Sequence, residues 1–234
     1  MNDVNQEKIM LKAENIVKNY ISGNETLHIL RGINFEIAEG KSAAVSGQSG
    51  SGKSTFLNII GGLDRCDEGK VIIGGDEITS LSEKELSLYR SKRVGFIFQF
   101  HYLLKDFTAL ENIMLPAFIA GVKKKDAVET AKSLLADVKL EERGGHFPSQ
   151  LSGGERQRIA VARSMVNDPA IILADEPTGN LDPQNSEIVA ELLYEGAQKR
   201  GKTLIVVTHD KKVASRACVQ LFLENGKFSQ EVQS

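Results

Sequence analysis

A glycine-rich segment followed by a lysine and two hydroxyl residues could bind the phosphates of a nucleotide. It matches the pattern G-x-x-x-x-G-K-[ST] and consists of Gly47, Gln48, Ser49, Gly50, Ser51, Gly52, Lys53, Ser54 and Thr55. Glycines let backbone N–H groups converge on phosphate oxygens that side chains would obstruct, and a following helix points its positive end at the same anion. In such a loop Lys53 reaches the β- and γ-phosphates, and the Ser54 hydroxyl ligates Mg²⁺. The pattern therefore predicts a site for ATP or a similar nucleotide together with Mg²⁺.

Two adjacent carboxylates, Asp175 and Glu176, follow the apolar run AIILA and precede Pro177. Such a run is typical of a buried strand, and ligands of open α/β sheets bind at the carboxyl ends of the strands. Asp175 would orient the Mg²⁺ ion or its water shell, and Glu176 would act as general base or polarise the attacking water. A solvated turn before Pro177 is the alternative, which the phosphate loop in the same chain disfavours.

Short apolar runs that alternate with helical patterns must position these two groups. We expect strands at residues 11–17, 27–37, 42–46, 71–73, 94–98, 170–174, 203–207, 219–223 and 227–229. We expect turns at residues 22–24 and 225–226, and helices at residues 53–60, at 185–199 and in several pieces within 108–166. Near-continuous apolar strands between helices indicate a parallel sheet covered on both faces. The expected fold class is α/β, with an antiparallel N-terminal portion and a helical insertion.

Composition narrows the classes of protein to which the chain can belong. Of 234 residues, 29 are Lys or Arg and 31 are Asp or Glu, so the chain lacks the basic excess of a nucleic-acid binder and we expect no nucleic-acid partner. Cys66 and Cys218 have no nearby partner in a CxxC pattern, which is typical of reduced thiols in a cytosolic protein. Residues 1–10 lack the apolar core of a signal peptide, and no run approaches 18 apolar residues. We therefore expect any link to a membrane to come through a partner.

A second glycine motif decides between classes of nucleotide-binding protein. The phosphate loop and the acidic pair alone would also suit a GTPase, a small-molecule kinase or a recombinase-like motor. Between the helical insertion and the acidic strand, however, lie Leu151, Ser152, Gly153, Gly154 and Glu155. The motif LSGGE would by itself be an ordinary capped helix start. In this order with the other motifs, the sequence resembles the ATP-binding-cassette (ABC) superfamily over essentially its whole length.

The resemblance implies roles for further residues. Gln99 is similar to the family's Q-loop glutamine, which ligates Mg²⁺ and senses the transmembrane partner, and His209 to the switch histidine at the γ-phosphate. Residues 180–182 resemble the D-loop that connects nucleotide sites. Tyr20 resembles the aromatic residue that stacks on adenine, although a core or surface tyrosine would fit this position nearly as well.

The family resemblance also implies an architecture and an assembly. We expect a single ABC ATPase domain over residues 1–234: a P-loop NTPase core, an antiparallel β-subdomain, and a helical subdomain inserted at about 100–167. Two copies would form a head-to-tail homodimer. Leu151, Ser152, Gly153, Gly154 and Glu155 of one chain would then contact the ATP bound to the other chain.

One stretch narrows the resemblance within the superfamily. Residues 95–116, GFIFQFHYLLKDFTALENIMLP, together with ADEPTGNLD and LNIIGGLD, are similar to the group of lipoprotein-release and macrolide-efflux ATPases. Lys105 departs from the proline usual in those relatives. In this group residues 99–119 pack against two transmembrane permease subunits. The apolar side chains there could equally belong to the core, and an exposed apolar patch would distinguish the two cases: Phe100, Tyr102, Leu103, Leu104 and Phe107.

These resemblances lead to one leading hypothesis and two alternatives. The first is an ATPase, peripheral on the cytoplasmic face of the inner membrane, that powers release of outer-membrane-directed lipoproteins. A macrolide or peptide efflux pump is the near alternative. A nucleotide-controlled signalling module that acts on cell-wall enzymes is the alternative from another class. Glu176→Gln should trap the dimer in every case, but only a transporter should lose substrate movement completely.

Overall fold

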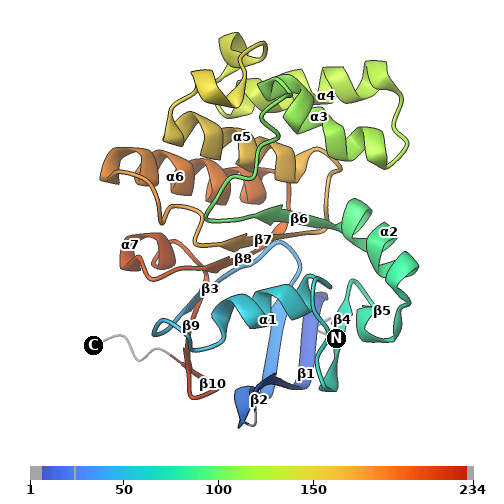
Figure 1. Cartoon of the computed structure of the whole chain (residues 1–234), viewed down its shortest axis with the longest axis vertical. Helices are drawn as coiled ribbons and strands as arrows, with labels where there is room; N and C mark the ends of the chain where they lie inside the picture. Colours follow the sequence, from blue (N-terminus) through green and yellow to red (C-terminus); the bar gives the residue numbers. More distant parts are fainter. Residues whose placement is uncertain (1–6, 24, 231–234) are drawn as a thin grey trace, which may run out of the picture.

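The structure is a computed structural model that describes residues 7–23 and 25–230. The expected absence of a signal peptide at residues 1–10 and the expected turn at 22–24 fall partly outside these residues. Figure 1 shows two sheets with one helix between them and a layer of helices above the larger sheet. Within the described part of the chain, no helix combines the length and apolar character needed to cross a bilayer.

Two sheets carry the architecture. The smaller is antiparallel in the order β2-β1-β4-β5, with β1 at Ile9–Ser22, β2 at Glu25–Ala38, β4 at Glu68–Ile73 and β5 at Asp76–Glu77. The larger runs β10-β9-β3-β8-β7-β6, with β3 at Ser42–Ser46, β6 at Val94–Ile97, β7 at Ile171–Asp175, β8 at Thr203–Val207, β9 at Val219–Glu224 and β10 at Lys227–Gln230. Its strands are parallel except β10, which forms a hairpin with β9.

Helices cover both faces of the larger sheet, as Figure 1 shows. They are α1 (Lys53–Ile60), α2 (Glu83–Arg93), α3 (Ala109–Ile119), α4 (Lys124–Asp137), α5 (Gly153–Met165), α6 (Pro183–Lys199) and α7 (Lys211–Ala214). Along β7, Ile171 and Leu173 join the core of α1 and the small sheet, whereas Ile172 and Ala174 join the core of α3 to α6. This alternation follows from the two-residue period of a strand, so α1 and α5 lie on opposite faces of the sheet.

Most of the expected elements are present, with differences at their ends. The bounds expected for β3, β8 and α1 agree with the structure, while β7 starts one residue later and includes Asp175. Helix α2 was missed because only Leu86 and Tyr89 of its residues are buried, so an apolar period is hardly visible. Its local signals are the capping box between Ser82 and Glu85 and the charges at its ends, acidic in the first turn and basic in the last. The short elements β5 and α7 were missed as well.

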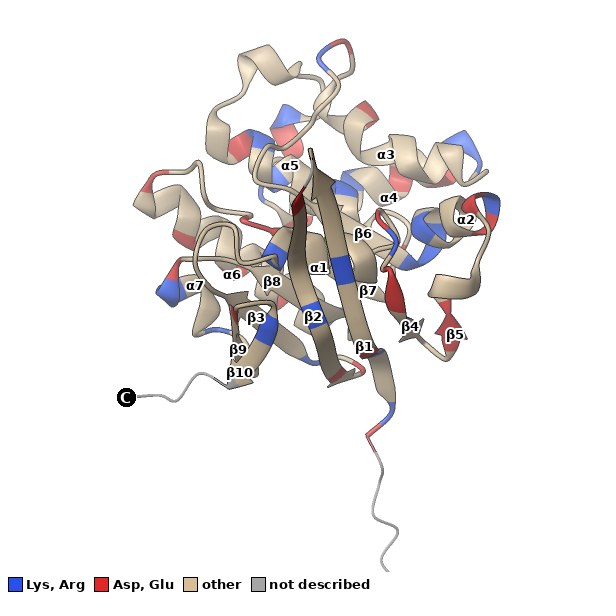
Figure 2. Cartoon of the chain, turned by 60° about the horizontal axis from the view of Figure 1, so that its bottom comes forward, with Lys and Arg blue, Asp and Glu red and all other residues tan. Residues whose placement is uncertain are grey.

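The exposed face of the small sheet carries paired charges of both signs. Lys12 of β1 lies opposite Glu36 of β2, with 3.2 Å between the ammonium nitrogen and the carboxylate. Glu14 lies opposite Lys70 of β4, with a corresponding distance of 2.9 Å. Figure 2 shows the resulting mixture of acidic and basic segments on this sheet. Opposite charges across a strand pair favour this register, because a slip of one residue would separate them.

Candidate functional site

The phosphate loop joins β3 to α1 and needs its glycines. Gly47, Gly50 and Gly52 all have positive φ angles, of 148°, 78° and 101°. A side chain at Gly47 would also place its Cβ 2.4 Å from the Leu223 carbonyl oxygen. Lys53 donates hydrogen bonds from Nζ to the carbonyls of Gly47 and Gln48, at 2.9 and 2.8 Å. These bonds hold the ammonium group over the loop.

The N-terminus of α1 is open to an anion. Its N-cap residue is Gly52, no side chain accepts from its first N–H groups, and its first turn contains no acidic residue. The free N–H groups and the positive end of the helix dipole therefore favour an anion here. The Ser51 hydroxyl oxygen is buried and has no hydrogen-bond partner in the described structure. An unpartnered polar group in this loop is explained by a ligand with polar atoms.

Asp175 ends β7 with a carboxylate suited to a hard cation. Its Oδ1 is buried and has no hydrogen-bond partner within the described residues. Burial raises the pKa of Asp175, and the charge of Glu176 adds to this, while the Ser54 hydroxyl and the Lys53 ammonium lower it. Oxygen donors from a hydroxyl and a carboxylate at one place fit Mg²⁺, which prefers such ligands and keeps several others from water or phosphate.

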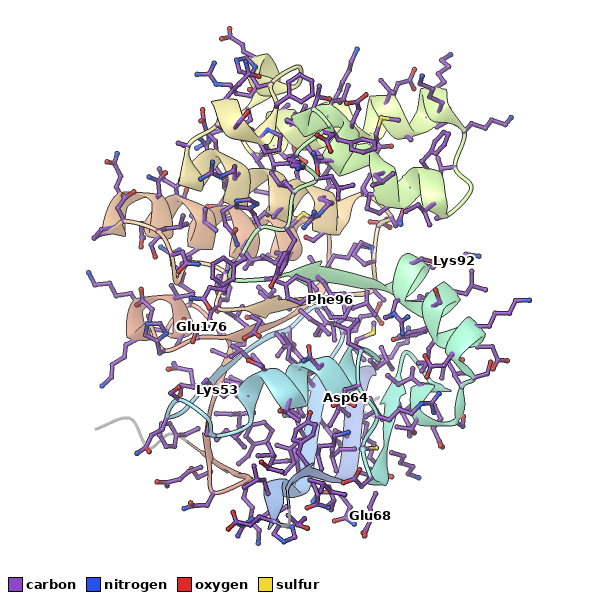
Figure 3. The ribbon with its side chains drawn as sticks, in the orientation of Figure 1. Lys53, Asp64, Glu68, Lys92, Phe96 and Glu176 are labelled. Atoms are coloured by element: carbon purple, nitrogen blue, oxygen red, sulfur yellow. The ribbon has the colours of Figure 1, made fainter. Side chains whose placement is uncertain are left out.

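Glu176 and His209 meet where two neighbouring strands end. Glu176 has a φ of 46°, and its N–H donates to the Val207 carbonyl of β8 at 2.8 Å. Its Oε1 lies 2.9 Å from His209 Nδ1. The Glu176 side chain is only 17% exposed, whereas that of His209 is 70% exposed. Figure 3 shows Glu176 at the same edge of the sheet as Lys53, so a carboxylate and a histidine stand beside the phosphate loop.

Gln99 is joined to the segment of residues 180–182. Its Nε2 donates to Asn180 Oδ1 at 3.2 Å, and Asn180 Nδ2 donates to the Gln99 carbonyl at 3.3 Å. Its side chain also packs against Gly179, where a Cβ would lie 3.1 Å from Nε2. The structure thus connects the predicted Q-loop with the predicted D-loop, and contact of Gln99 with Mg²⁺ stays a prediction.

The LSGGE segment starts α5 with a complete capping box. Ser152 accepts from the Glu155 N–H at 3.2 Å, and Glu155 accepts from the Ser152 N–H at 2.8 Å. Arg143 holds the other Glu155 oxygen at 3.0 Å. Ser152 and Gly153 remain exposed. Gly154 is buried, and a Cβ there would lie 2.1 Å from the Oδ1 of Asn185 in α6, so this close approach requires glycine.

Tyr20 stands at the end of β1 with its ring 40% exposed. Its hydroxyl donates to Asp64 Oδ2 at 2.7 Å, and the Lys18 ammonium lies 5.0 Å from the ring centroid. Burial and Asp64 raise the pKa of Tyr20, while the Thr55 hydroxyl lowers it. The hydroxyl is therefore close to Thr55 in the first turn of α1, and stacking of the ring on an adenine stays a prediction.

The segment after Gln99 exposes most of its large apolar side chains. Phe100 and Tyr102 are 60% and 63% exposed, and Leu104 and Phe107 are also exposed. Leu103 instead packs against the core of the helical layer, so for this residue the core interpretation holds. Phe118 and Ile119 at the end of α3 and Leu88 on α2 are also exposed. A patch of this kind is typical of a surface that binds a partner.

Side chains of helix α5 form hydrogen bonds with the backbone of this exposed segment and of the residue that precedes Gln99. Gln157 donates to the Phe98 carbonyl at 3.0 Å. Arg163 donates to the carbonyls of His101 and Tyr102, at 2.7 and 2.9 Å. Sequence reasoning found neither residue, nor Arg143, Lys18 or the role of Asp64, because each acts on a distant part of the chain that no local pattern reveals.

Comparisons with known proteins agree with this site. A family model described as "ABC transporter" matches residues 30–179. The chain belongs to the ABC transporter family, as one of its ATPases, which confirms the resemblance seen in the sequence. Within that family it is similar to the "Lipoprotein-releasing system ATP-binding protein LolD" of Treponema denticola, at 56% identity over 95% of this chain and 99% of the relative. The protein of the same name from Bacteroides thetaiotaomicron is 49% identical over 88% of this chain and 92% of the relative.

Solved structures give the same result for the fold. A dimeric structure of the ATP-binding cassette MJ0796 in a post-hydrolysis state, bound to ADP and Pi, is similar with a TM-score of 0.87 and 38% identity. The match covers 96% of this chain and 100% of that chain. The expected α/β fold class with an antiparallel sheet is confirmed.

Proposed function

We propose that this chain is the ATP-hydrolysing subunit of a transporter that releases outer-membrane-directed lipoproteins from the inner membrane. The site supports the ATPase: Glu176 and His209 lie 2.9 Å apart at the strand ends beside the phosphate loop. The relatives named for a lipoprotein-releasing system, which align with nearly the whole chain, support this substrate over a macrolide or a peptide.

Each residue of the site has a task in hydrolysis. The loop N–H groups and Lys53 would hold the phosphates, and Ser54, Asp175 and Gln99 would hold Mg²⁺. When bound, Mg²⁺ neutralises charge that develops on the phosphates. Glu176 would accept a hydrogen bond from the attacking water, with His209 fixing the carboxylate orientation. The described residues contain no group of three or more His, Cys, Asp or Glu that could bind a metal. Mg²⁺ usually keeps several ligands from water and substrate phosphates and needs only one or two protein carboxylates.

The proposed active unit is a homodimer. Ser152 and Gly153 are exposed at the start of α5, which packs on the face of the larger sheet opposite to α1, and we infer that they contact the ATP of a second chain. A hollow of about 840 Å³ opens beside His209, between residues 178–187 and α7, and provides room for that second chain. The solved relative MJ0796, which is dimeric and bound to ADP and Pi, supports a dimer.

The exposed segment after Gln99 is the proposed contact with two transmembrane permease subunits. A groove of about 390 Å³ lined by residues of α2, β6 and α5 includes Phe98, whose ring packs edge-on against that of Tyr102 with 5.6 Å between the centroids. The helical layer at about 100–167 would act as a subdomain that carries this surface. Docking there would place the chain at the cytoplasmic face of the inner membrane as a peripheral subunit.

A reconstituted complex tests the proposal. The chain is purified with the membrane proteins that accompany it, placed in vesicles that contain a lipid-anchored protein, and supplied with MgATP. We expect ATP-dependent release of the lipidated protein to a soluble acceptor. Glu176→Gln should reduce hydrolysis by about 10²-fold or more and abolish release. Glu195→Gln, which removes an exposed charge on α6, is the matched control and should do neither.

The alternatives give different results in the same vesicles. Hydrolysis without release of the lipidated protein, but with movement of a macrolide or peptide, would replace the proposed substrate. Hydrolysis that moves no substrate and instead switches on a bound cell-wall enzyme would indicate a signalling module. A complex that binds no ATP would overturn the ATPase itself.

A further inference from the structure

We infer that Asp64 and Lys18 are positioning residues that hold the Tyr20 ring as a platform for the base of the nucleotide. The inference rests on the proposed ATPase function, because the platform has a purpose only if ATP binds at the loop. Neither residue touches the loop itself. Both would act through the ring of Tyr20.

Asp64 connects two elements that are far apart in the sequence. It follows α1, whereas Lys18 and Tyr20 lie on β1. One carboxylate oxygen accepts from the Tyr20 hydroxyl at 2.7 Å, and the other accepts from Lys18 Nζ at 2.9 Å. Lys18 Nζ also donates to the Arg65 carbonyl at 2.6 Å. One carboxylate thus fixes both the far end of the ring and the cation that covers it.

The environment of Lys18 makes this arrangement stiff. The residue is only 9% exposed, and a buried cation is costly unless it is paired. Burial lowers the pKa of Lys18, but the contact with Asp64 outweighs it and leaves the pKa raised, with Tyr20 and Asp67 adding to the effect. The ammonium is therefore charged at neutral pH and remains bound to Asp64.

Tyr20 is 40% exposed, and Lys18 covers its ring from one side. The ammonium lies over the ring at 5.0 Å from its centroid, within the range of a cation–π contact. Leu27 of β2, the register partner of Tyr20, is 45% exposed and extends the apolar surface. A hydroxyl that donates to a carboxylate makes the ring a better electron donor, and an anchored ring loses less entropy when a flat base stacks on it.

The test compares two ligands that share phosphates but differ in the base. Dissociation constants of the full chain are measured for MgATP and for magnesium tripolyphosphate. Asp64→Asn should weaken ATP about threefold to tenfold and leave tripolyphosphate unchanged, since a stacked aromatic pair is worth roughly 0.5–1.5 kcal/mol. Tyr20→Phe keeps the Lys18–Asp64 pair and should weaken MgATP binding less, again without changing tripolyphosphate binding. This variant tests the inference if Asp64→Asn does not fold. Glu83→Gln, which breaks the neighbouring exposed pair with Arg65, is the matched control.

The outcomes separate this inference from the proposed function. A combined Tyr20→Phe and Asp64→Asn variant no weaker for ATP than Asp64→Asn alone supports the inference, because both changes remove one interaction. Unchanged ATP affinity in Asp64→Asn and in Tyr20→Phe, with a loss in Tyr20→Ala, overturns it and leaves the ATPase intact. Equal weakening of ATP and tripolyphosphate also overturns it, by showing a general structural role. A wild-type chain that binds neither ligand would sink the proposed function and the inference with it.

Discussion

Two helices of this protein begin with glycine-rich sequence, but one has a side-chain cap at its first turn and the other has none. Helix α1 starts at Gly52, with no side-chain cap and no acidic residue in its first turn. Helix α5 has Ser152 as its N-cap and forms a capping box between Ser152 and Glu155. Arg143 donates a further hydrogen bond to Glu155. Both helix starts resemble anion sites in sequence, but only α5 has a side-chain cap at its first turn.

The difference indicates two kinds of phosphate contact. An uncapped first turn gains the most from a bound anion, so α1 suits continuous binding of the nucleotide. The capped turn of α5 folds without a ligand and keeps Ser152 and Gly153 exposed, which suits an ATP that arrives with a second chain. The predictions below test this division, from the largest expected effect to the smallest.

Lys53→Ala should abolish most ATP binding. With a nucleotide bound, the ammonium would make charge-assisted contacts to phosphate, and losing two of them would weaken binding about 10²- to 10³-fold. Titration calorimetry with MgATP measures the change, and Lys199→Ala on the exposed face of α6 is the control. Retained micromolar affinity in Lys53→Ala would contradict the assignment of α1 as the main anion site.

Gly154→Ala should destabilise the start of α5, whereas Gly153→Ala should leave the stability of the protein nearly unchanged. The added Cβ at Gly154 meets Asn185 at 2.1 Å, whereas at Gly153 its nearest neighbour is Leu181 at 3.8 Å. We expect Gly154→Ala to lower the free energy of unfolding by about 1–3 kcal/mol. ATP binding to the single chain should persist in both variants. Denaturant unfolding and ATP titration of both variants would show whether the two effects separate.

Ser152→Ala should cost about 1 kcal/mol of stability through loss of the N-cap. The matched change at α1, Gly52→Ala, should also lower stability, but through strain rather than the loss of a cap. Gly52 has a φ of 101°, and a Cβ there would meet the Ile29 side chain at 2.9 Å. Saturating ATP should offset part of the stability lost in Gly52→Ala, because the ligand binds the folded state at α1. In a single chain it should offset none of the stability lost in Ser152→Ala. Thermal unfolding with and without MgATP distinguishes the two.

The smallest effect is a pH dependence at Glu155. The hydrogen bond from the Ser152 N–H holds the pKa of Glu155 below its ordinary value, with burial opposing and Arg143 contributing. A carboxyl with a lowered folded pKa adds stability above its unfolded pKa and loses it as the pH falls through the folded pKa. Between pH 6 and pH 3, Glu155→Gln should therefore lose less stability than wild type, by under about 1 kcal/mol. Parallel curves for the two proteins would contradict the capping role.

Local patterns sufficed for the elements whose chemistry is itself local. The loop from Gly47 to Thr55 and the apolar runs of β3 and β8 carry their structure in adjacent residues, so they could be predicted closely. The position of the acidic pair was predictable as well, because a buried strand that ends in carboxylates places them at the edge of the sheet where ligands bind. The roles of the pair in catalysis remain predictions, which Glu176→Gln addresses.

Long-range pairs could not be predicted in the same way. Asp64 lies inside LNIIGGLD, yet nothing in that motif indicates that it bonds to Tyr20, 44 residues earlier. The partner of Gln99, Asn180, is 81 residues away. Such contacts depend on how β1, α1 and the strand ends converge in three dimensions, and one sequence contains no record of that convergence.

The hydrogen bonds from Arg163 make helix α5 a connection between two surfaces of the protein. Its 13 residues form a rod about 20 Å long, with Ser152 at one end and Arg163 near the other. Because Arg163 grips the backbone of His101 and Tyr102, the rod carries the exposed aromatic segment with it. A single helix thus connects the surface proposed to contact a second ATPase with the surface proposed to contact a permease.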